Sequence, residues 1–288
     1  MVKTIEQGFS EFHSRLTPTG GESDAAKSHR ASIEACLKTN FGMTRFYRTG
    51  SFGNGTDISG YSDVDYFAVI PRENLTQNSS YTLQVIRNAL DARFPYTGVT
   101  VRTPTVLIPF GINASEATEI VPAYYIKEEN GYPIYGIPDG QGSWMQSSPD
   151  THLAWISSEN DRLNKKVKPL IRFVKAWKYY RNVPLSSFYL ELYTTKYISS
   201  EKVVVYSVDL KTIFKKLWES QLANIQNPAG ASGYIQPCES EAQKSDALSK
   251  LQTALTRAEN AREQEGAGNI HDAFDWWNLV FGGFPSYY

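Results

Sequence analysis

The sequence predicts an α+β protein whose strands lie in the first half of the chain and whose second half is helical. Short runs of aromatic and β-branched residues bounded by Gly and Pro are typical of strands, and they end before residue 150. Beyond that point apolar residues recur every three to four positions, which is typical of amphipathic helices. We therefore expect residues 1–149 to form a mixed sheet with flanking helices and residues 150–288 a helical lobe. An active site would lie in the cleft between them.

Composition places the chain among ordinary globular proteins. Its 288 residues are 41% hydrophobic and 20% charged, which is enough for two lobes. The net charge is −1 and the pI is about 6.5, so no basic field predicts an obligatory nucleic-acid partner, and a small substrate is favoured. No apolar run approaches the ~20 residues that span a bilayer. With two widely separated cysteines, Cys36 and Cys238, we expect a cytoplasmic protein that does not act at a membrane, and take a monomer as the default.

The order of elements follows from these patterns. The first segment is expected to be a helix because Ile5, Phe9, Phe12 and Leu16 share one helical face. Further helices are expected at about 22–39 and 79–94, and strands at 45–48, 66–70, 99–102, 105–110 and 117–124. Residues 124–149 are rich in Gly, Pro, Tyr and Ser and predict an irregular hairpin. Helices then follow at 150–162, 164–181, from about 187, and at 208–221, 240–264 and 270–281, with a loop at 227–237.

The segment Gly50–Phe67 concentrates the residues that indicate chemistry. Gly50-Ser51 interrupts an aromatic strand, and a glycine-rich turn can direct backbone N–H groups at a phosphate, with the Ser51 hydroxyl as a further donor. Asp63 and Asp65 are one residue apart at the start of an apolar strand. Side chains alternate across a strand, so both carboxylates share a face. Two converging carboxylates predict a site for a hard cation such as Mg²⁺.

A solvated turn is the alternative interpretation of Asp63 and Asp65, because Asp-x-Asp is common in turns. These two acids lead directly into the buried run Tyr66–Ile70. Placing two like charges at the mouth of a buried strand is costly unless a cation pairs with them. The sequence therefore favours a metal site over a solvated turn.

Gly-Ser, a short glycine-containing turn and Asp-x-Asp on the next strand resemble the nucleotidyltransferase superfamily of DNA polymerase β. That superfamily carries a third carboxylate on a later strand, and Glu119, followed by Ile120-Val121-Pro122-Ala123, is similar to that strand in bacterial cGAS/DncV-like nucleotidyltransferases (CD-NTases). Family members usually carry Asp there. The resemblance implies that Asp63, Asp65 and Glu119 are catalytic and hold two Mg²⁺ ions, with Mn²⁺ as an alternative. Glu116 is the weaker candidate because it would face the other side of the strand.

The helical half carries a second resemblance. The stretch LIRFVKAW, residues 170–177, is similar to a helix of cGAS-like enzymes and oligoadenylate synthases in which the lysine equivalent to Lys175 reaches the nucleotide triphosphate. The same resemblance implies that Ser187 touches the triphosphate or the base and that Phe188 stacks on the base, with Gly50 and Ser51 completing the nucleotide-binding set. Base stacking contributes ~1–3 kcal/mol per base in nucleic-acid binders. The residues themselves leave open that a serine only caps the helix and that Phe188 only packs.

From the residues alone, the inference reaches metal-dependent nucleotidyl transfer. The resemblance implies a synthase that condenses nucleoside triphosphates, ATP with GTP or a pyrimidine nucleotide, into a cyclic di- or trinucleotide messenger, as in bacterial anti-phage signalling (CBASS). Alternatives are transfer to a small molecule, a protein or an RNA end, a catalytically silent nucleotide-binding regulator, and a helical interaction module. A silent regulator would more readily have lost one of the three acids, and an interaction module leaves the glycine turn and aligned acids unexplained. Base identity, linkage and ring size stay open.

Overall fold

The computed structural model describes residues 2–18, 24–61, 64–112, 116–227 and 233–288, and the contacts reported below concern these residues. Their main sheet is mixed, with the strand order β1-β2-β5-β4-β3. β2 and β5 pair in parallel, and the other neighbours pair antiparallel. The strands are β1 Arg45–Arg48, β2 Val64–Val69, β3 Thr100–Arg102, β4 Thr105–Phe110 and β5 Glu116–Glu129. This architecture confirms the predicted α+β class.

β5 is long enough to serve two parts of the sheet. Its first half pairs with β2 and β4, and after an irregularity between Tyr125 and Lys127 it pairs with β6 (Tyr132–Pro138). β7 (Trp144–Ser147) extends this second part by pairing with β6. The region predicted as an irregular hairpin is therefore regular antiparallel ribbon. Its turn is made by Asn130 and Gly131, both of which have positive φ.

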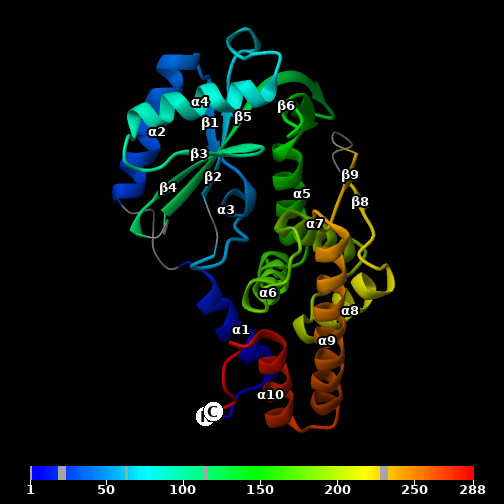
Figure 1. The fold of residues 1–288 in the computed structure, drawn as a ribbon. Helices are drawn as coiled ribbons and strands as arrows, with labels where there is room; N and C mark the ends of the chain where they lie inside the picture. The colour runs from blue at the N-terminus through cyan, green and yellow to red at the C-terminus, as the bar shows by residue number, and fades with distance from the viewer. Residues whose placement is uncertain (1, 19–23, 62–63, 113–115, 228–232) are drawn as a thin grey trace.

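The two faces of the sheet carry different neighbours. α2 (Asp24–Phe41) and α4 (Ser79–Arg93) lie along one face, as the blue and cyan helices of Figure 1 show, and bury Tyr66 and Ile120 there. Alternation along β2 and β5 sends Phe67 and Ala123 to the opposite face, where they form a smaller core with Tyr135. The paired acids described below lie on this second face, opposite α2 and α4.

Helices dominate the second half of the chain, as predicted. They are α5 Pro149–Arg162, α6 Val167–Tyr180, α7 Ser187–Ile198, α8 Tyr206–Glu219, α9 Glu241–Gly266 and α10 Ile270–Phe281, with a small ribbon of β8 Ile225–Gln226 and β9 Tyr234–Ile235. α6 lies at the centre, and every residue from Val167 to Trp177 except Lys168 is buried. α5 is tied to the sheet at its first turn, where Asp150 accepts from Arg45 (2.9 Å) and Tyr47 (3.1 Å).

The first helix packs with the helical half of the chain. Phe9 and Phe12 of α1 (Ile5–Leu16) are buried against Phe173 of α6 and Phe284 near the end of the chain. In Figure 1, α1 lies below the sheet and beside α10. The division into two lobes at residue 149 stays a prediction. α1 precedes that division in the sequence but contributes to the core of the helical half.

None of the helices that the structure describes combines the length and the apolar character needed to cross a membrane.

Candidate active site

The parallel pairing of β2 and β5 brings two predicted acids together. Asp65 and Glu119 are direct register partners, so their side chains leave the sheet on the same face. This is the face opposite α2 and α4, because the next residues, Tyr66 and Ile120, are buried beneath those helices. Asp63 lies outside the described residues, and its place beside Asp65 stays a prediction.

Glu119 is held in position by its neighbours. Its carboxylate accepts from Arg102 Nη1 (2.9 Å) and Thr105 Oγ1 (3.1 Å), both from the β3–β4 hairpin, and the Glu119 side chain is 14% exposed. The sequence analysis missed Arg102, whose relation to Glu119 depends on the pairing of three strands. Glu116 lies on the other face of β5, with its carboxylate 3.7 Å from His29, as alternation predicts. The oxygen ligands of Asp65 and Glu119 suit a hard divalent cation.

The glycine turn is a short helix, α3 (Gly50–Asn54), that lies against Asp65. The Thr49 N–H donates to the Asp65 carbonyl (2.9 Å), and Gly50 has φ +59°. A Cβ on Gly50 would stand 2.0 Å from Asp65 Oδ2, so only glycine allows this approach. Ser51 is half-buried and follows directly. The structure therefore brings Gly50 beside Asp65, with Ser51 next along the chain.

The structure differs from the expectation for Lys175. The Lys175 side chain is wholly buried, and its ammonium lies 2.7 Å from Glu191 Oε1 and donates to the Thr56 carbonyl (3.0 Å). Burial raises the pKa of Glu191, but the charge and hydrogen bond of Lys175, with further bonds from Thr56 and Asn54, outweigh it and leave that pKa below its ordinary value. In this arrangement the ammonium is enclosed, because α6 is buried on all sides at this level, so the structure does not present Lys175 to a triphosphate.

Lys178, about one turn further along α6, is the lysine that lies beside Ser187. Its ammonium donates to Ser187 Oγ (2.6 Å), and the Tyr179 hydroxyl also lies 3.0 Å from that oxygen. The pKa of Lys178 is lowered to about 8, first by burial and then by the positive charge of Lys175. The negative charge of Glu191 acts in the opposite direction and raises it. Ser186 is the N-cap of α7 and accepts from the Tyr189 N–H (3.3 Å). Ser187 is therefore not needed as a cap.

Phe188 presents its ring at the surface, with 37% of the residue exposed. One edge contacts His152 of α5 at a centroid distance of 5.0 Å. His152 is buried, which lowers its pKa, and its Nε2 lies 2.7 Å from Asn227 Oδ1. The exposed ring suits the predicted stacking role, and neither His152 nor Asn227 was singled out from the sequence.

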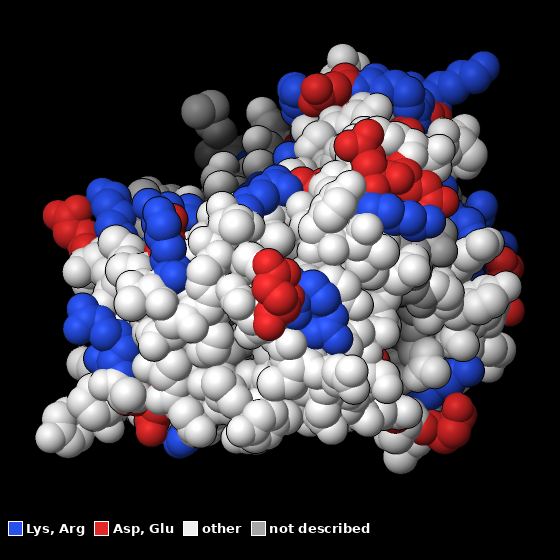
Figure 2. All heavy atoms as spheres, turned by 90° about the horizontal axis from the view of Figure 1, so that it is seen from above, with Lys and Arg blue, Asp and Glu red and all other residues white. Residues whose placement is uncertain are grey.

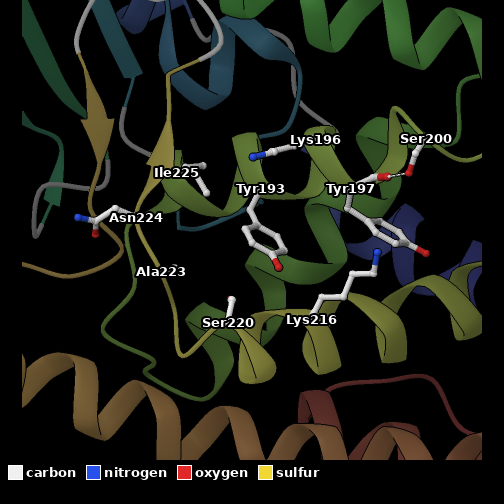
Figure 3. A pocket seen from close by; sticks show the side chains of 9 residues that line it. All are labelled: Tyr193, Lys196, Tyr197, Ser200, Lys216, Ser220, Ala223, Asn224 and Ile225. Carbon is white, nitrogen blue, oxygen red and sulfur yellow. Dashed lines mark hydrogen bonds between the residues drawn. The ribbon is translucent and has the colours of Figure 1, made fainter.

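Two other features of the described residues lie apart from these groups. A cavity of about 350 Å³ opens on another face of α7, between Tyr193, Lys196 and Tyr197 of that helix and Lys216 of α8 (Figure 3). His271, Asp272 and Asp275 form an exposed group with metal-ligand spacing at the start of α10, at the far end of the molecule from β2 (Figure 1). None of the predicted site residues belongs to either feature.

A mixed sheet with paired acids on one face and a helical lobe beside it is the architecture of a nucleotidyltransferase. The family model described as the Second Messenger Oligonucleotide or Dinucleotide Synthetase domain matches residues 3–160, more than half of the chain. The chain therefore belongs to this family of bacterial cGAS/DncV-like nucleotidyltransferase enzymes.

Known proteins agree with this assignment. A probable cyclic nucleotide synthase of Bacillus cereus is 24% identical over 252 residues, which cover 82% of this chain and 75% of the relative. A cyclic AMP-AMP-AMP synthase of an Acinetobacter species is 23% identical over 190 residues, 62% of this chain and 53% of the relative.

Two solved structures share the fold. CdnC of Escherichia coli MS115-1, solved with ATP, matches with a TM-score of 0.75 and 19% identity, covering 97% of this chain and 98% of CdnC. The cyclic AMP-GMP synthase DncV of Vibrio cholerae, solved with a linear intermediate, matches with a TM-score of 0.75 and 16% identity, covering 99% and 97%. At these identities the likeness shows a common fold.

Proposed function

We propose that this chain is a divalent-metal-dependent synthase that condenses nucleoside triphosphates into a cyclic di- or trinucleotide messenger and releases pyrophosphate. The observation that carries the proposal is the register of Asp65 with Glu119 on the sheet face beside Gly50. Family membership supports the class of reaction. The relatives named for cyclic AMP-AMP-AMP and cyclic AMP-GMP differ in base and ring size, so those properties of this chain's product are for experiment to determine.

The acids would hold the metal. Asp65 and Glu119, with Asp63, would bind two Mg²⁺ ions, with Mn²⁺ as an alternative. Bound ions of this kind offset charge on a triphosphate and lower the pKa of an attacking ribose hydroxyl. Arg102, paired with Glu119 in this structure, keeps the carboxylate directed along the site face. Glutamate in place of the usual aspartate is supported by Thr105, which fixes its second oxygen.

The nucleotide would lie between α3 and the helical lobe. Lys178 and Ser187 would contact the phosphates of ATP, with Gly50 and Ser51 on the sheet side, and Phe188 would stack on the base. Positive charge and hydroxyl donors placed before the reaction stabilise the charge that develops during phosphoryl transfer. GTP or a pyrimidine nucleotide would be the second substrate. We place this activity in the cytoplasm, in anti-phage signalling, because the substrates are nucleoside triphosphates and the family makes second messengers.

Surface charge bears on the alternative of an RNA-end substrate. On the face seen from above in Figure 2, Lys and Arg are interspersed with Asp and Glu around broad uncharged areas. Binding to a nucleic-acid backbone depends on clustered positive charge. With a net charge of −1 as well, the observations favour free nucleotides as acceptors.

The experiment is incubation of the purified protein with Mg²⁺ or Mn²⁺ and four labelled ribonucleoside triphosphates, then phosphatase treatment and mass spectrometry. We expect a phosphatase-resistant product without a free phosphate end, and none from Asp65→Asn or Asp63→Asn protein that keeps wild-type thermal stability. Product formation that is unaffected by both substitutions would remove the metal role. A labelled protein or RNA end in place of the cyclic product would favour the other acceptors.

A further inference from the structure

The end of α3 and the residues directly after it are hydrogen-bonded to the helical lobe through a buried charged network. Glu191 of α7 accepts from Asn54 Nδ2 (3.0 Å) and from Thr56 Oγ1 (2.6 Å), while Lys175 of α6 pairs with the same carboxylate at 2.7 Å. Lys175 also donates to the Thr56 carbonyl at 3.0 Å. All four residues are buried. The network therefore joins three elements through a carboxylate that solvent scarcely reaches.

A second contact fastens the same segment. Arg172 of α6 donates from Nε to the Asp57 carbonyl (2.9 Å), and its guanidinium lies 3.3 Å from the Asp57 carboxylate. On the other side, α3 touches the sheet through Thr49 and Gly50, both against Asp65. Residues 49–57 thus form a bridge from the acids of β2 to α6 and α7, the helices that carry Lys178 and Ser187.

We propose that Glu191, together with Lys175, is a positioning pair that sets the placement of α3, and so of Gly50 and Ser51, relative to Lys178 and Ser187 without touching substrate. The proposal rests on the proposed function in taking Lys178 and Ser187 as phosphate contacts. A buried ion pair is often no more stabilising than apolar residues of similar size. What the charged network adds is direction, because three of its hydrogen bonds hold Asn54 Nδ2, Thr56 Oγ1 and the Thr56 carbonyl oxygen, each in one place.

The helical lobe offers matched controls. On α7, Thr194 is as buried as Thr56, and its hydroxyl has no hydrogen-bond partner among the residues described. Asp209 of α8 is a buried acid that accepts from the Tyr197 hydroxyl and the Val205 N–H, each at 2.7 Å. Tyr197 lies on the face of α7 that lines the cavity of Figure 3, whereas Glu191 faces α3 and α6.

The first test removes one hydrogen bond without changing charge. Thr56→Val should raise the KM for nucleoside triphosphate about tenfold, the factor that a lost hydrogen bond to a charged group represents, with a smaller change in kcat. Thr194→Val should leave both constants unchanged. Equal KM values in the two variants would overturn the proposal.

The second test separates positioning from stability. In the double variant Lys175→Met, Glu191→Leu, the free energy of unfolding should stay near that of wild type while the KM for nucleotide rises. The amide hydrogens of residues 50–56 should exchange faster. Asp209→Asn should show the reverse, with lower stability but wild-type KM and wild-type exchange at residues 50–56.

Two outcomes would contradict the positioning role. One is a double variant whose amide exchange at residues 50–56 matches wild type; the other is a rise in KM in Asp209→Asn as large as in the double variant. Amide exchange needs no turnover, so the network remains testable if the wild-type protein makes no cyclic product. In that case the proposed function fails, and the exchange result still shows whether the network holds residues 50–56 in place.

Discussion

Lys178 of α6 has a pKa low enough for its charge to respond to pH near neutrality. Its pKa of about 8 lies far below that of an ordinary lysine, because the side chain is half-buried and Lys175 is near. The negative charge of Glu191 opposes that shift. Ser187 accepts a hydrogen bond from the Lys178 ammonium, and the Tyr179 hydroxyl lies beside the same serine. Below pH 8 the ammonium is protonated and can bind phosphate, and as pH rises through 8 the free enzyme loses that charge.

We therefore expect kcat/KM for nucleotide to fall above about pH 8, and Lys178→Arg to remove this fall, because a guanidinium stays charged over the whole range. Initial rates between about pH 6.5 and 9.5 measure it. A descending limb that survives unchanged in Lys178→Arg would assign the titration to another group.

At this scale the sequence indicated the acids more directly than the lysine. Alternation along one strand predicts that Asp63 and Asp65 share a face, and the resemblance to the family's third metal-binding strand indicated Glu119. The register of β2 with β5 then brings Asp65 and Glu119 together. Lys175 and Lys178 belong to one polar stripe of α6 with Lys168 and Arg172, so the sequence does not show which of these lysines the fold buries. Arg102 could not be found, since only the pairing of β3, β4 and β5 brings it to Glu119.

Among the elements, α3 depends on one backbone conformation. Gly50→Ala would meet Asp65 and adopt a left-handed conformation that costs about 1–2 kcal/mol. We expect kcat/KM to fall by about 100-fold, the effect of displacing a reacting group by about 1 Å. Gly98→Ala is the control, since Gly98 also has positive φ but its added methyl would meet nothing within 4 Å. Comparable activity losses in the two variants would mean that backbone strain alone is responsible.

The start of α7 divides capping from binding between adjacent serines. Ser186→Ala removes the N-cap and should lower the free energy of unfolding by about 1 kcal/mol in urea titrations, with little effect on KM. Ser187→Ala removes the hydroxyl bonded to Lys178 and Tyr179, and should raise KM while leaving stability near wild type. The reverse pattern would restore the interpretation of Ser187 as a cap.

Most elements could be predicted because their patterns are local. The runs 45–48 and 105–110 and the apolar faces of α4 and α10 each show their period within a few residues. The long ribbon of β5 and β6 was missed as regular structure because Gly and Pro within it indicate loops. Nothing local indicates that β2 pairs in parallel with a strand some fifty residues away.

Over the whole molecule, α1 ties the beginning of the chain to the helical core. Phe9 is 1% exposed and lies within about 5 Å of the ring centres of Phe173, Trp277 and Phe284. Phe9→Ala should therefore cost about 3–5 kcal/mol of unfolding free energy. Tyr96→Ala, at a fully exposed position, should change it by less than about 0.5 kcal/mol. A Phe9 variant as stable as the Tyr96 variant would place α1 outside the core.

The bridge of residues 49–57 also limits how this protein can recombine with its relatives. Asn54 and Thr56 belong to the first half of the chain, and Lys175 and Glu191 to the second. A chimera joined near residue 149 would inherit the two halves of this network from different parents. We expect such hybrids to make product only when both parents carry the same four side chains, however well their sheets and helices fold separately.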